Sequence, residues 1–199
     1  MLKSIYRFLS PKFQNIFLDY KVDMRPRYGH GLPAHKGLYE IINAHRSDYE
    51  LILKEALKYK EQFWIIKDSS IEKDSIKPAW NNGFLPGLDI IAIYAILAKF
   101  KPSKYIEIGS GNSTKVAYKA KKELGLTTKI ISIDPMPRAE IDSLADEVHR
   151  KPFENLDFDI VDLLEENDIL FVDNSHRILP NSDSMVFYME ILQKMKKGV

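Results

Sequence analysis

Tyr105-Ile-Glu-Ile-Gly-Ser-Gly-Asn-Ser-Thr114 carries the clearest structural signal in this chain, and Ile130-Ile-Ser-Ile-Asp134 follows it after room for one helix. In the first segment a β-branched strand leads into two glycines, which let the backbone turn sharply and a ligand come close. The polar residues after the second glycine are good helix N-caps. The second segment ends at an acidic residue, where it can accept hydrogen bonds from a ribose diol. Together the two segments predict a nucleoside-cofactor site.

The glycine spacing favours a cofactor without phosphate. A dinucleotide site typically has a third glycine, G-x-G-x-x-G, so that a pyrophosphate can lie at the helix N-terminus. Thr114 occupies that third position here. Glu107, two residues before Gly109, would also repel a pyrophosphate, because like charges disfavour each other. S-adenosylmethionine carries a sulfonium and an ammonium group and no phosphate, so it suits an acidic neighbour.

The pattern E-x-G-x-G of Glu107 to Gly111 resembles motif I of the class I S-adenosylmethionine-dependent methyltransferases, and the similarity extends over residues 80–199. Trp80-Asn-Asn-Gly-Phe-Leu-Pro-Gly-Leu-Asp89 looks like the segment that closes over the methionine end of the cofactor in a subgroup of these enzymes. Ile131-Ser-Ile-Asp-Pro-Met-Pro-Arg138 looks like their second-strand motif. Asp168-Ile-Leu-Phe-Val-Asp-Asn-Ser-His176 looks like the fourth strand and catalytic end of small-molecule O-methyltransferases and the related cephalosporin hydroxylase-like family.

The resemblance implies a role for each residue of the glycine turn. Glu107 would face the methionine end of the cofactor, partly through water, and Asp134 would hold the ribose. The turn and the helix start would allow close approach and offer donors through Gly109, Ser110, Gly111, Asn112, Ser113 and Thr114. Asn82 and Phe84 are weaker candidates from the closing segment. The acidic residue that often holds adenine in this family has no clear match near Glu147-Val-His-Arg150.

The resemblance further implies methyl transfer to a small molecule at oxygen, an in-line displacement in which the protein positions the reactants and excludes water. His176, just past the fourth strand, would be the base that takes the hydroxyl proton. Asp173 is the second catalytic candidate, or the first carboxylate of a Mg²⁺ site whose other ligands follow the fourth strand in metal-dependent relatives. A structural turn is the alternative, because Asn174 and Ser175 are turn formers and Asp173 could cap main-chain amides.

Strands alternate with helices from Pro86 onward, which predicts an α/β fold with a Rossmann-like doubly wound parallel sheet. The expected strands are 105–108, 129–133, 147–149 and 169–172, and the expected helices are 88–100, 113–124, 139–145, 159–165 and 182–196. In such a sheet ligands bind beyond the carboxyl ends of the strands. Gly109, Gly111, Asp134 and Asp173 should gather there.

The sequence ends at Lys197-Gly-Val199, where the resemblance places the start of the fifth strand of a seven-stranded sheet. The expectation is therefore an incomplete class I methyltransferase fold over residues 80–199, truncated after the fourth strand. Ile169-Leu-Phe-Val172 would then be an exposed apolar edge, which invites association. A second copy of the chain, another partner or the N-terminal extension would cover that edge.

Residues 1–79 are expected to form a mainly helical N-terminal extension. Between Met1 and Leu18, Leu2, Ile5, Phe8, Leu9, Phe13, Ile16 and Phe17 alternate with Lys3, Arg7 and Lys12. Such a helix could lie on a membrane surface. Packing of the apolar stripe on the domain is favoured, because Pro11 interrupts the helix and the basic residues are few.

The rest of the extension combines a loop with a helical pattern. The segment from Arg25 to Lys36 is typical of a loop, either a polar linker or a lid carrying Arg27, Tyr28, His30 and His35 to the site. Residues 37–62 have helical spacing with a break near 45–48, and 63–66 would be a short strand.

The amino-acid composition narrows the kinds of partner and site that this chain can have. Lysine plus arginine (29) nearly balance aspartate plus glutamate (28), so no global field points to nucleic acid or an anionic membrane, and a small-molecule methyl acceptor is the expected partner. The absence of cysteine excludes a disulfide framework and a thiolate zinc site, and fits a cytoplasmic protein. The longest apolar run, Ile90 to Ala98, is about half of a transmembrane span.

Two other functions stay open. A non-catalytic remnant acting as an interaction module would keep Glu107 to Asp134 and bind the cofactor, yet turn over nothing. A nicotinamide-dependent oxidoreductase is the second competitor, and Thr114 and Glu107 disfavour it.

Overall fold

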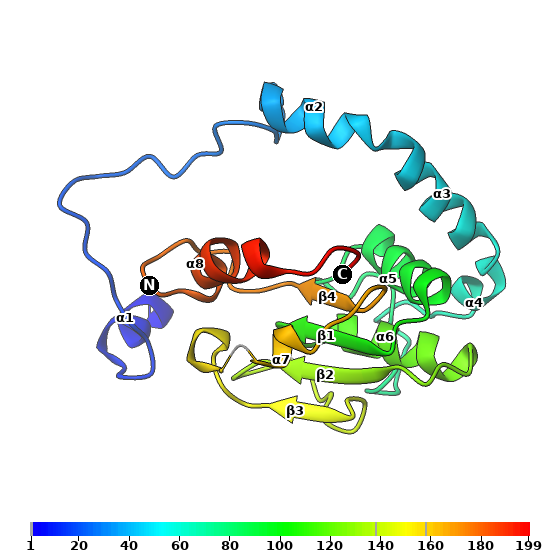
Figure 1. Cartoon of the computed structure of the whole chain (residues 1–199). Coiled ribbons are helices and arrows are strands. Elements are labelled where there is room, and N and C mark those ends of the chain that lie inside the picture. The colour runs from blue at the N-terminus through cyan, green and yellow to red at the C-terminus, as the bar shows by residue number, and fades with distance from the viewer. Residues whose placement is uncertain (1, 138, 158) are drawn as a thin grey trace. The chain divides into compact units, whose positions relative to one another are not determined.

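The computed structural model of the chain describes residues 2–137, 139–157 and 159–199; Met1 and Arg138, which belong to two of the segments discussed above, lie outside them. The chain divides into two compact units, Met1–Arg46 and Ser47–Val199. Figure 1 labels the helices and strands of both. None of the helices in the described ranges has the length and apolar character needed to span a bilayer.

In its described part, the first unit contains the helices α1 and α2, and its residues 3–46 form no buried core. Helix α1 (Leu2–Leu9) ends before Pro11, as expected from the missing N–H of proline. Helix α2 (Lys36–Ala44) begins after His35, whose Nδ1 accepts a hydrogen bond from the main-chain N–H of Leu38 (3.2 Å). No residue between 3 and 46 is buried. The predicted loop between the helices is confirmed, and its lid role stays a prediction.

The helical pattern over 37–62 forms three helices rather than one. Helix α2 ends next to His45, within the predicted break, and α3 (Arg46–Leu57) and α4 (Lys60–Trp64) follow. The predicted strand at 63–66 is wrong, because Phe63 and Trp64 complete α4 and the N–H of Ile66 donates to the carbonyl of Phe63 (3.1 Å). Short apolar runs do not distinguish a strand from a buried helical turn.

The second unit is built on a four-stranded sheet in which all strands are parallel. Its strands are β1 (Lys104–Ile108), β2 (Lys129–Ile133), β3 (Glu147–His149) and β4 (Ile169–Val172), in the order β3-β2-β1-β4. Glu107 of β1 lies opposite Ser132 of β2 and Phe171 of β4. The four predicted strands are confirmed, and the sheet is Rossmann-like.

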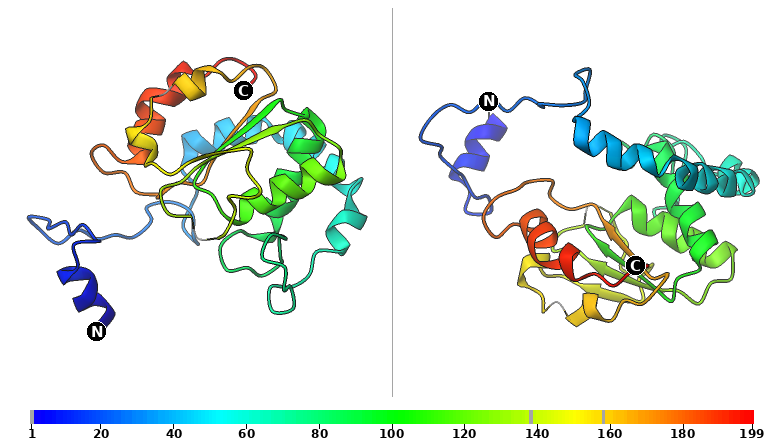
Figure 2. Two further views of the ribbon diagram at one scale, coloured as in Figure 1. Left: turned by 90° about the horizontal axis from the view of Figure 1, so that it is seen from below. Right: turned by 45° about the horizontal axis from the view of Figure 1, so that its top comes forward.

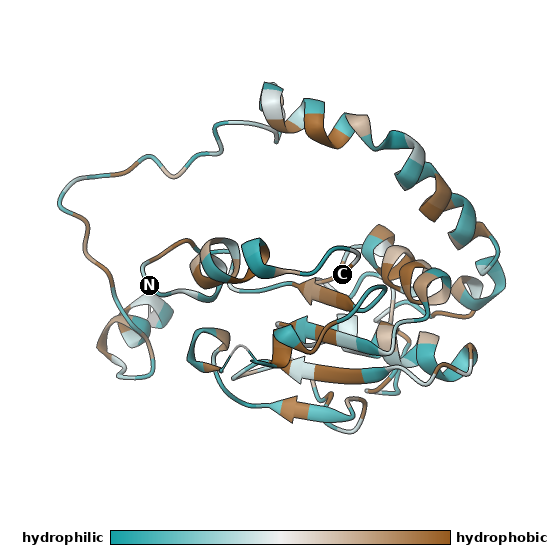
Figure 3. Cartoon of the chain, viewed as in Figure 1, coloured by the Kyte–Doolittle hydropathy of each residue, from teal (hydrophilic) through white to brown (hydrophobic). Residues whose placement is uncertain are grey.

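Helices cover both faces of this sheet, as the left view of Figure 2 shows. Tyr105 and Ile130 pack toward α5 (Gly87–Phe100) and α6 (Asn112–Glu123). The alternate residues Ile106 and Ile131 pack on the opposite face. They contact residues from the 3₁₀ turn η1 (Phe153–Asn155), from α7 (Asp159–Asp162) and from the helical stretch 183–191. Figure 3 shows the hydrophobic residues along β2 and β4. Because successive side chains of a strand point to opposite faces, two layers of core result.

Three predicted helices differ in the structure. Residues 139–145 form turns instead of a helix; Ile141 and Leu144 are buried, and Asp142 and Ser143 between them favour local turns. The helix expected over 182–196 is a composite of α8 (Asp183–Val186), a π-helical stretch η2 (Phe187–Ile191) and a 3₁₀ turn η3 (Leu192–Lys194). The predicted helices at 88–100 and 113–124 are confirmed within one residue, and only Asp159–Asp162 of the one expected over 159–165 is helical.

Strand β4 is at the edge of the sheet, and its four residues are half-buried. Asp168, directly before it, is buried and joins its start to β1. The carboxylate of Asp168 accepts hydrogen bonds from the hydroxyl of Ser103 (2.7 Å), the main-chain N–H of Lys104 (2.7 Å) and that of Glu165 (3.1 Å). This side chain therefore fixes the position of β4 relative to its neighbour.

Candidate functional site

A cavity of about 750 Å³ opens at the carboxyl ends of β1, β2 and β4. The residues that end these strands line it, including Ile108, Ile133 and Asp173. This is the edge at which parallel α/β sheets bind their ligands. The predicted site residues that line the cavity are Asn82, Phe84, Gly109, Ser110, Gly111, Asn112, Ser113, Asp134, Asp173 and His176. Glu107 and Thr114 are fully buried beside it.

Positions 109 and 111 of the turn are glycine for different structural reasons. Gly109 has a φ of +86°, and a Cβ there would lie 1.8 Å from the carbonyl oxygen of Asp173. The N–H of Asp173 in turn donates to the carbonyl of Ile108 (2.9 Å). Gly109 is thus required by the close passage of the ends of β1 and β4. A Cβ at Gly111 would meet nothing within 4 Å, so the backbone there is open to a ligand.

Glu107 holds the helix start in place. Its carboxylate accepts hydrogen bonds from the hydroxyls of Ser113 (3.0 Å) and Thr114, and the Thr114 oxygen accepts from the N–H of Gly111 (3.1 Å). Burial raises the pKa of Glu107 to about 7, against the opposing effect of these hydroxyls. The predicted contact of Glu107 with a ligand would therefore run through Ser113.

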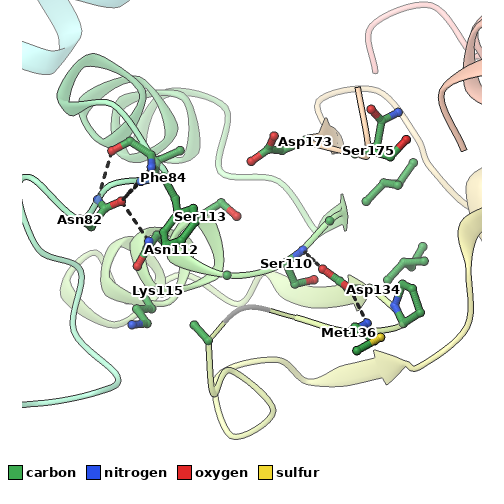
Figure 4. Close-up of a pocket in the computed structure, with 18 of the residues that line it drawn as sticks. Asn82, Phe84, Ser110, Asn112, Ser113, Lys115, Asp134, Met136, Asp173 and Ser175 are labelled. Carbon is green, nitrogen blue, oxygen red and sulfur yellow. Dashed lines mark hydrogen bonds between the residues drawn. The ribbon is translucent and has the colours of Figure 1, made fainter. Parts of the chain in front are cut away.

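Asp134 closes the turn from the side of β2. One carboxylate oxygen accepts from the N–H of Ser110 (2.8 Å) and the other from the N–H of Met136 (2.7 Å), as Figure 4 shows. A carboxylate has about four acceptor positions, so each oxygen keeps one for a further donor. Asp134 can therefore accept a diol without releasing the turn.

The segment before α5 is tied to the start of α6 by one side chain. The Asn82 amide oxygen accepts from the N–H of Leu85 (2.8 Å) and from the side-chain amide of Asn112 (3.0 Å), and its NH₂ group donates to the carbonyl of Ala79 (2.9 Å). Figure 4 shows this group and Phe84 beside Asn112. The predicted closing segment therefore borders the cavity, with Asn82 as its organising residue.

Beyond β4, His176 and Asp173 form a solvent-accessible pair. The Nε2 atom of His176 lies 3.4 Å from Asp173 Oδ1, and the two side chains are 74% and 47% exposed. The main-chain amides of this turn are capped by other residues: Asn174 accepts from the N–H of His176 (3.1 Å), and Asp183 accepts from the N–H of Ser175 (2.8 Å). The Asp173 carboxylate is thus available to the histidine.

The described residues add no support for the predicted metal site at Asp173. Within the described residues, no group of three or more His, Cys, Asp or Glu side chains is arranged to hold a metal ion. The Mg²⁺ site at Asp173 stays a prediction.

Several lining residues were not foreseen from the sequence. The polar connector between α4 and α5, residues 68–77, contributes part of the wall through residues such as Glu72 and Asp74. Half-buried Lys115 lies on the first turn of α6; burial lowers the pKa of Lys115 and nearby Asp74 opposes that shift. Met136, Pro152 and Phe153 supply apolar surface near the ends of β2 and β3. Lys115 could have been found from its place three residues after Asn112, on the first turn of the helix. The connector carries no motif that predicts its position.

The cavity is richer in carboxylates than in cations. Its acidic lining residues are Glu72, Asp74, Asp134, Glu154, Asp173 and Asp183, and its lysines are Lys73, Lys77 and Lys115. Such a lining disfavours a pyrophosphate and suits a polar ligand that carries positive charge.

Comparisons with protein-family models, with curated proteins and with solved structures found no match to this chain.

Proposed function

We propose that this chain binds S-adenosylmethionine in the cavity and transfers its methyl group to a small molecule at oxygen. The observation that carries the proposal is the place of Asp134, whose carboxylate lies at the end of β2 beside the glycine turn and retains free acceptor positions. That is where a ribose diol would be held in a parallel α/β sheet.

The residues present fit this cofactor. A volume of about 750 Å³ lies within the range of small-molecule sites and leaves room for a second small molecule. The open backbone at Gly111 allows close approach. The excess of carboxylates suits a ligand with a sulfonium and an ammonium group.

Each part of the cofactor has candidate partners. Asp134 would hold the ribose, and Met136, Pro152 and Phe153 would provide an apolar environment for the adenine. The Ser113 hydroxyl, held by Glu107, would lie toward the methionine end.

Bound S-adenosylmethionine supplies an electrophilic methyl group on a sulfonium centre. The residues that line the cavity would orient the acceptor toward that methyl group. His176 takes the proton of the acceptor hydroxyl, and Asp173, 3.4 Å away, stabilises the resulting imidazolium.

A nicotinamide cofactor suits this site less well. The third glycine position holds Thr114, which is buried and bonded to both Glu107 and Gly111. The Gly111 N–H already donates to this side chain, so it is not available to a pyrophosphate at the helix start, and the carboxylates that line the cavity disfavour a phosphate.

The first test is calorimetric titration of the purified chain with S-adenosylhomocysteine. Micromolar binding is expected, and Asp134→Ala should weaken it roughly 10–100-fold, because a hydrogen-bonded charge is lost. Asp134→Asn, which keeps one acceptor oxygen, should fall between the two. The control is Asp157→Ala, an exposed aspartate, which should bind like the parent chain. Urea unfolding of each variant shows whether the fold is retained.

The second test is turnover with a panel of phenols and alcohols, followed through the release of S-adenosylhomocysteine. His176→Ala should retain cofactor binding and lose about 10²–10⁴-fold in rate. Binding that depends on Asp134 without turnover of any acceptor would identify a non-catalytic cofactor-binding module. Tighter binding of NAD than of S-adenosylhomocysteine would replace the proposal by the oxidoreductase.

A further inference from the structure

The N-terminal segment, residues 3–18, folds back on itself as a short hook. After α1, the N–H of Phe13 donates to the carbonyl of Ser10 (3.1 Å), and the Asn15 side chain donates to the carbonyl of Phe8 (3.1 Å). Ring pairs connect the two arms: Tyr6 with Phe13, and Phe8 with Phe17, each with 6.1 Å between centroids. The hook therefore presents its aromatic residues as a group.

These aromatic residues are not buried by the pairing. The large apolar side chains of the hook are 44–79% exposed: Ile5, Tyr6, Phe8, Leu9, Phe13, Ile16, Phe17 and Leu18. Large contiguous apolar patches are uncommon on soluble proteins and usually mark an interaction site. Since no residue between 3 and 46 is buried, the hook has no interior of its own in which to place them.

All charges of the hook have one sign. Lys3, Arg7 and Lys12 are its only charged residues, and the first acidic residue is Asp19. In α1, Lys3 and Arg7 lie one turn apart on the side opposite to Ile5 and Leu9, as expected from helical periodicity. Figure 3 shows the mixture of polar and apolar residues along this segment. The guanidinium of Arg7 lies 5.8 Å from the centre of the Phe13 ring, so positive charge borders the apolar side chains.

We propose that this hook docks on an anionic lipid surface. The apolar side chains would enter the boundary between headgroups and acyl chains, and the three basic residues would face lipid phosphates and carboxylates. Charge complementarity identifies the partner, because a hook with only positive charges around aromatic residues matches a negative surface with an apolar layer beneath it. The helix has eight residues and cannot cross a bilayer, so it lies in the plane of the surface.

The experiment is co-sedimentation of the full chain with vesicles. Vesicles of phosphatidylcholine with about 30% phosphatidylserine should bind the chain, and pure phosphatidylcholine vesicles should bind it much less. Binding should also fall when salt is raised from about 0.1 M to 0.5 M, because screening shortens the range of the attraction.

Two sets of variants separate charge from apolar contact. The triple variant K3E/R7E/K12E should bind anionic vesicles at least about 100-fold more weakly, from roughly fivefold for each basic residue lost. Leu9→Asp combined with Phe17→Asp should weaken binding about tenfold or more for each residue. The matched control is K60E/K151E/K197E, which makes the same change in net charge on exposed lysines of the second unit.

Fluorescence gives an independent readout. The chain has no cysteine, so a single Phe17→Cys or Ser4→Cys variant can carry an environment-sensitive dye. The dye at position 17, in the apolar group, should shift to the blue on anionic vesicles, and the dye at position 4 should change little.

Three results would overturn the proposal. In the first, the folded chain does not sediment with anionic vesicles. In the second, the triple variant and its control bind the vesicles equally. In the third, changing Leu9 and Phe17 abolishes self-association of the chain and leaves vesicle binding unchanged. The last result, measured by light scattering, would identify a second copy as the occupant. Cofactor titration is independent of all three, so failure here leaves the proposed function untouched.

Discussion

Gly109 shows how a single residue without a side chain supports the candidate site. Its φ of +86° and the 1.8 Å that would separate a Cβ from the Asp173 carbonyl oxygen leave no room for any other residue. The glycine motif therefore has a structural reason that holds without any ligand.

Gly109→Ala should lower the free energy of unfolding by about 3 kcal/mol or more, because the backbone of Asp173, directly after β4, has to move as well as the turn. The control is Gly125→Ala: Gly125 also has a positive φ, +62°, but a Cβ there would meet nothing within 4 Å. That variant should lose only about 1–2 kcal/mol. Urea unfolding measures both, and equal losses would contradict the steric explanation.

Glu107 is the residue whose charge state should matter most for stability. Burial raises its pKa to about 7 from the ordinary 4.5, so the folded chain favours the protonated form. The stability that Glu107 contributes is fully present below about pH 4.5 and is lost as pH rises through 7, which amounts to about 3 kcal/mol.

Glu107→Gln cannot ionise and should escape this loss. Relative to the parent chain, its free energy of unfolding should rise by up to about 3 kcal/mol between roughly pH 5 and pH 8. Urea unfolding at the two pH values is the measurement. Glu147→Gln is the contrasting variant, because a hydrogen bond from Lys129 lowers the pKa of Glu147 and its contribution is instead lost as pH falls. A constant difference between the Glu107→Gln variant and the parent would refute the assignment.

At the scale of elements, the strands were predictable and some helices were not. Residues 129–133, 147–149 and 169–172 form strands within the predicted bounds, because β-branched or apolar runs end there at charged or turn-forming residues. In the similar run Phe63–Ile66, Phe63 and Trp64 complete α4 instead, since a run of four apolar residues fits the period of a helix as well as that of a strand. At 139–145 the buried side chains are three residues apart, as in a helix, yet the local turns prevail.

The residues of the candidate site that lie directly after a strand were predictable from the sequence. Gly109, Asp134 and Asp173 meet because parallel strands share one carboxyl edge. The wall formed by residues such as Asp74 depends on how a connector without regular structure folds over that edge. No local pattern encodes such a path, so only the structure shows it.

Asp168 joins two elements, and its loss should be costly. Asp168→Ala removes the buried carboxylate that accepts from Ser103, Lys104 and Glu165, so three hydrogen bonds to a charged group are lost. We expect a loss of about 2–4 kcal/mol in the free energy of unfolding. Asp168→Asn should lose less, and Asp157→Ala, at an exposed position, should lose almost nothing.

The pH dependence of the free energy of unfolding tests whether these hydrogen bonds stabilise the ionised form of Asp168. Burial by itself raises the pKa of Asp168, but the hydrogen bonds from Ser103, Lys104 and Glu165 outweigh it and hold the pKa below its ordinary value. The contribution of Asp168 is therefore present above about pH 4 and is lost as pH falls, and the difference between the parent chain and Asp168→Ala should shrink in acid. A difference that grows in acid would show that the carboxylate is not stabilised by these donors.

For the whole molecule, the first unit, in which no residue between 3 and 46 is buried, is where a protease should cut first. Lys21 and Arg27 lie in the exposed connection between α1 and α2, which has no regular helix or strand, whereas Arg25 is protected by the following proline. Trypsin should therefore cut after Lys21 and Arg27 before any site within 104–172, because cutting in the sheet requires unfolding. Mass spectrometry of a time course identifies the cuts. The urea-unfolded chain, which should be cut at all sites at similar rates, is the control. Cuts within the sheet as early as those after Lys21 and Arg27 would contradict this expectation.

The absence of buried side chains between residues 3 and 46 has a consequence for how this chain can change during evolution. Core residues such as Ile106 are restricted by the volume and shape of their neighbours, so most replacements reduce the yield of folded protein. Phe8 is more than half exposed and contacts the Phe17 ring at its edge, so a substitution there should reduce the yield little unless something outside the unit makes contact with it. A mutational scan scored by protein abundance should thus be nearly flat across this region, and any position that still rejects substitutions marks a contact made in the living cell.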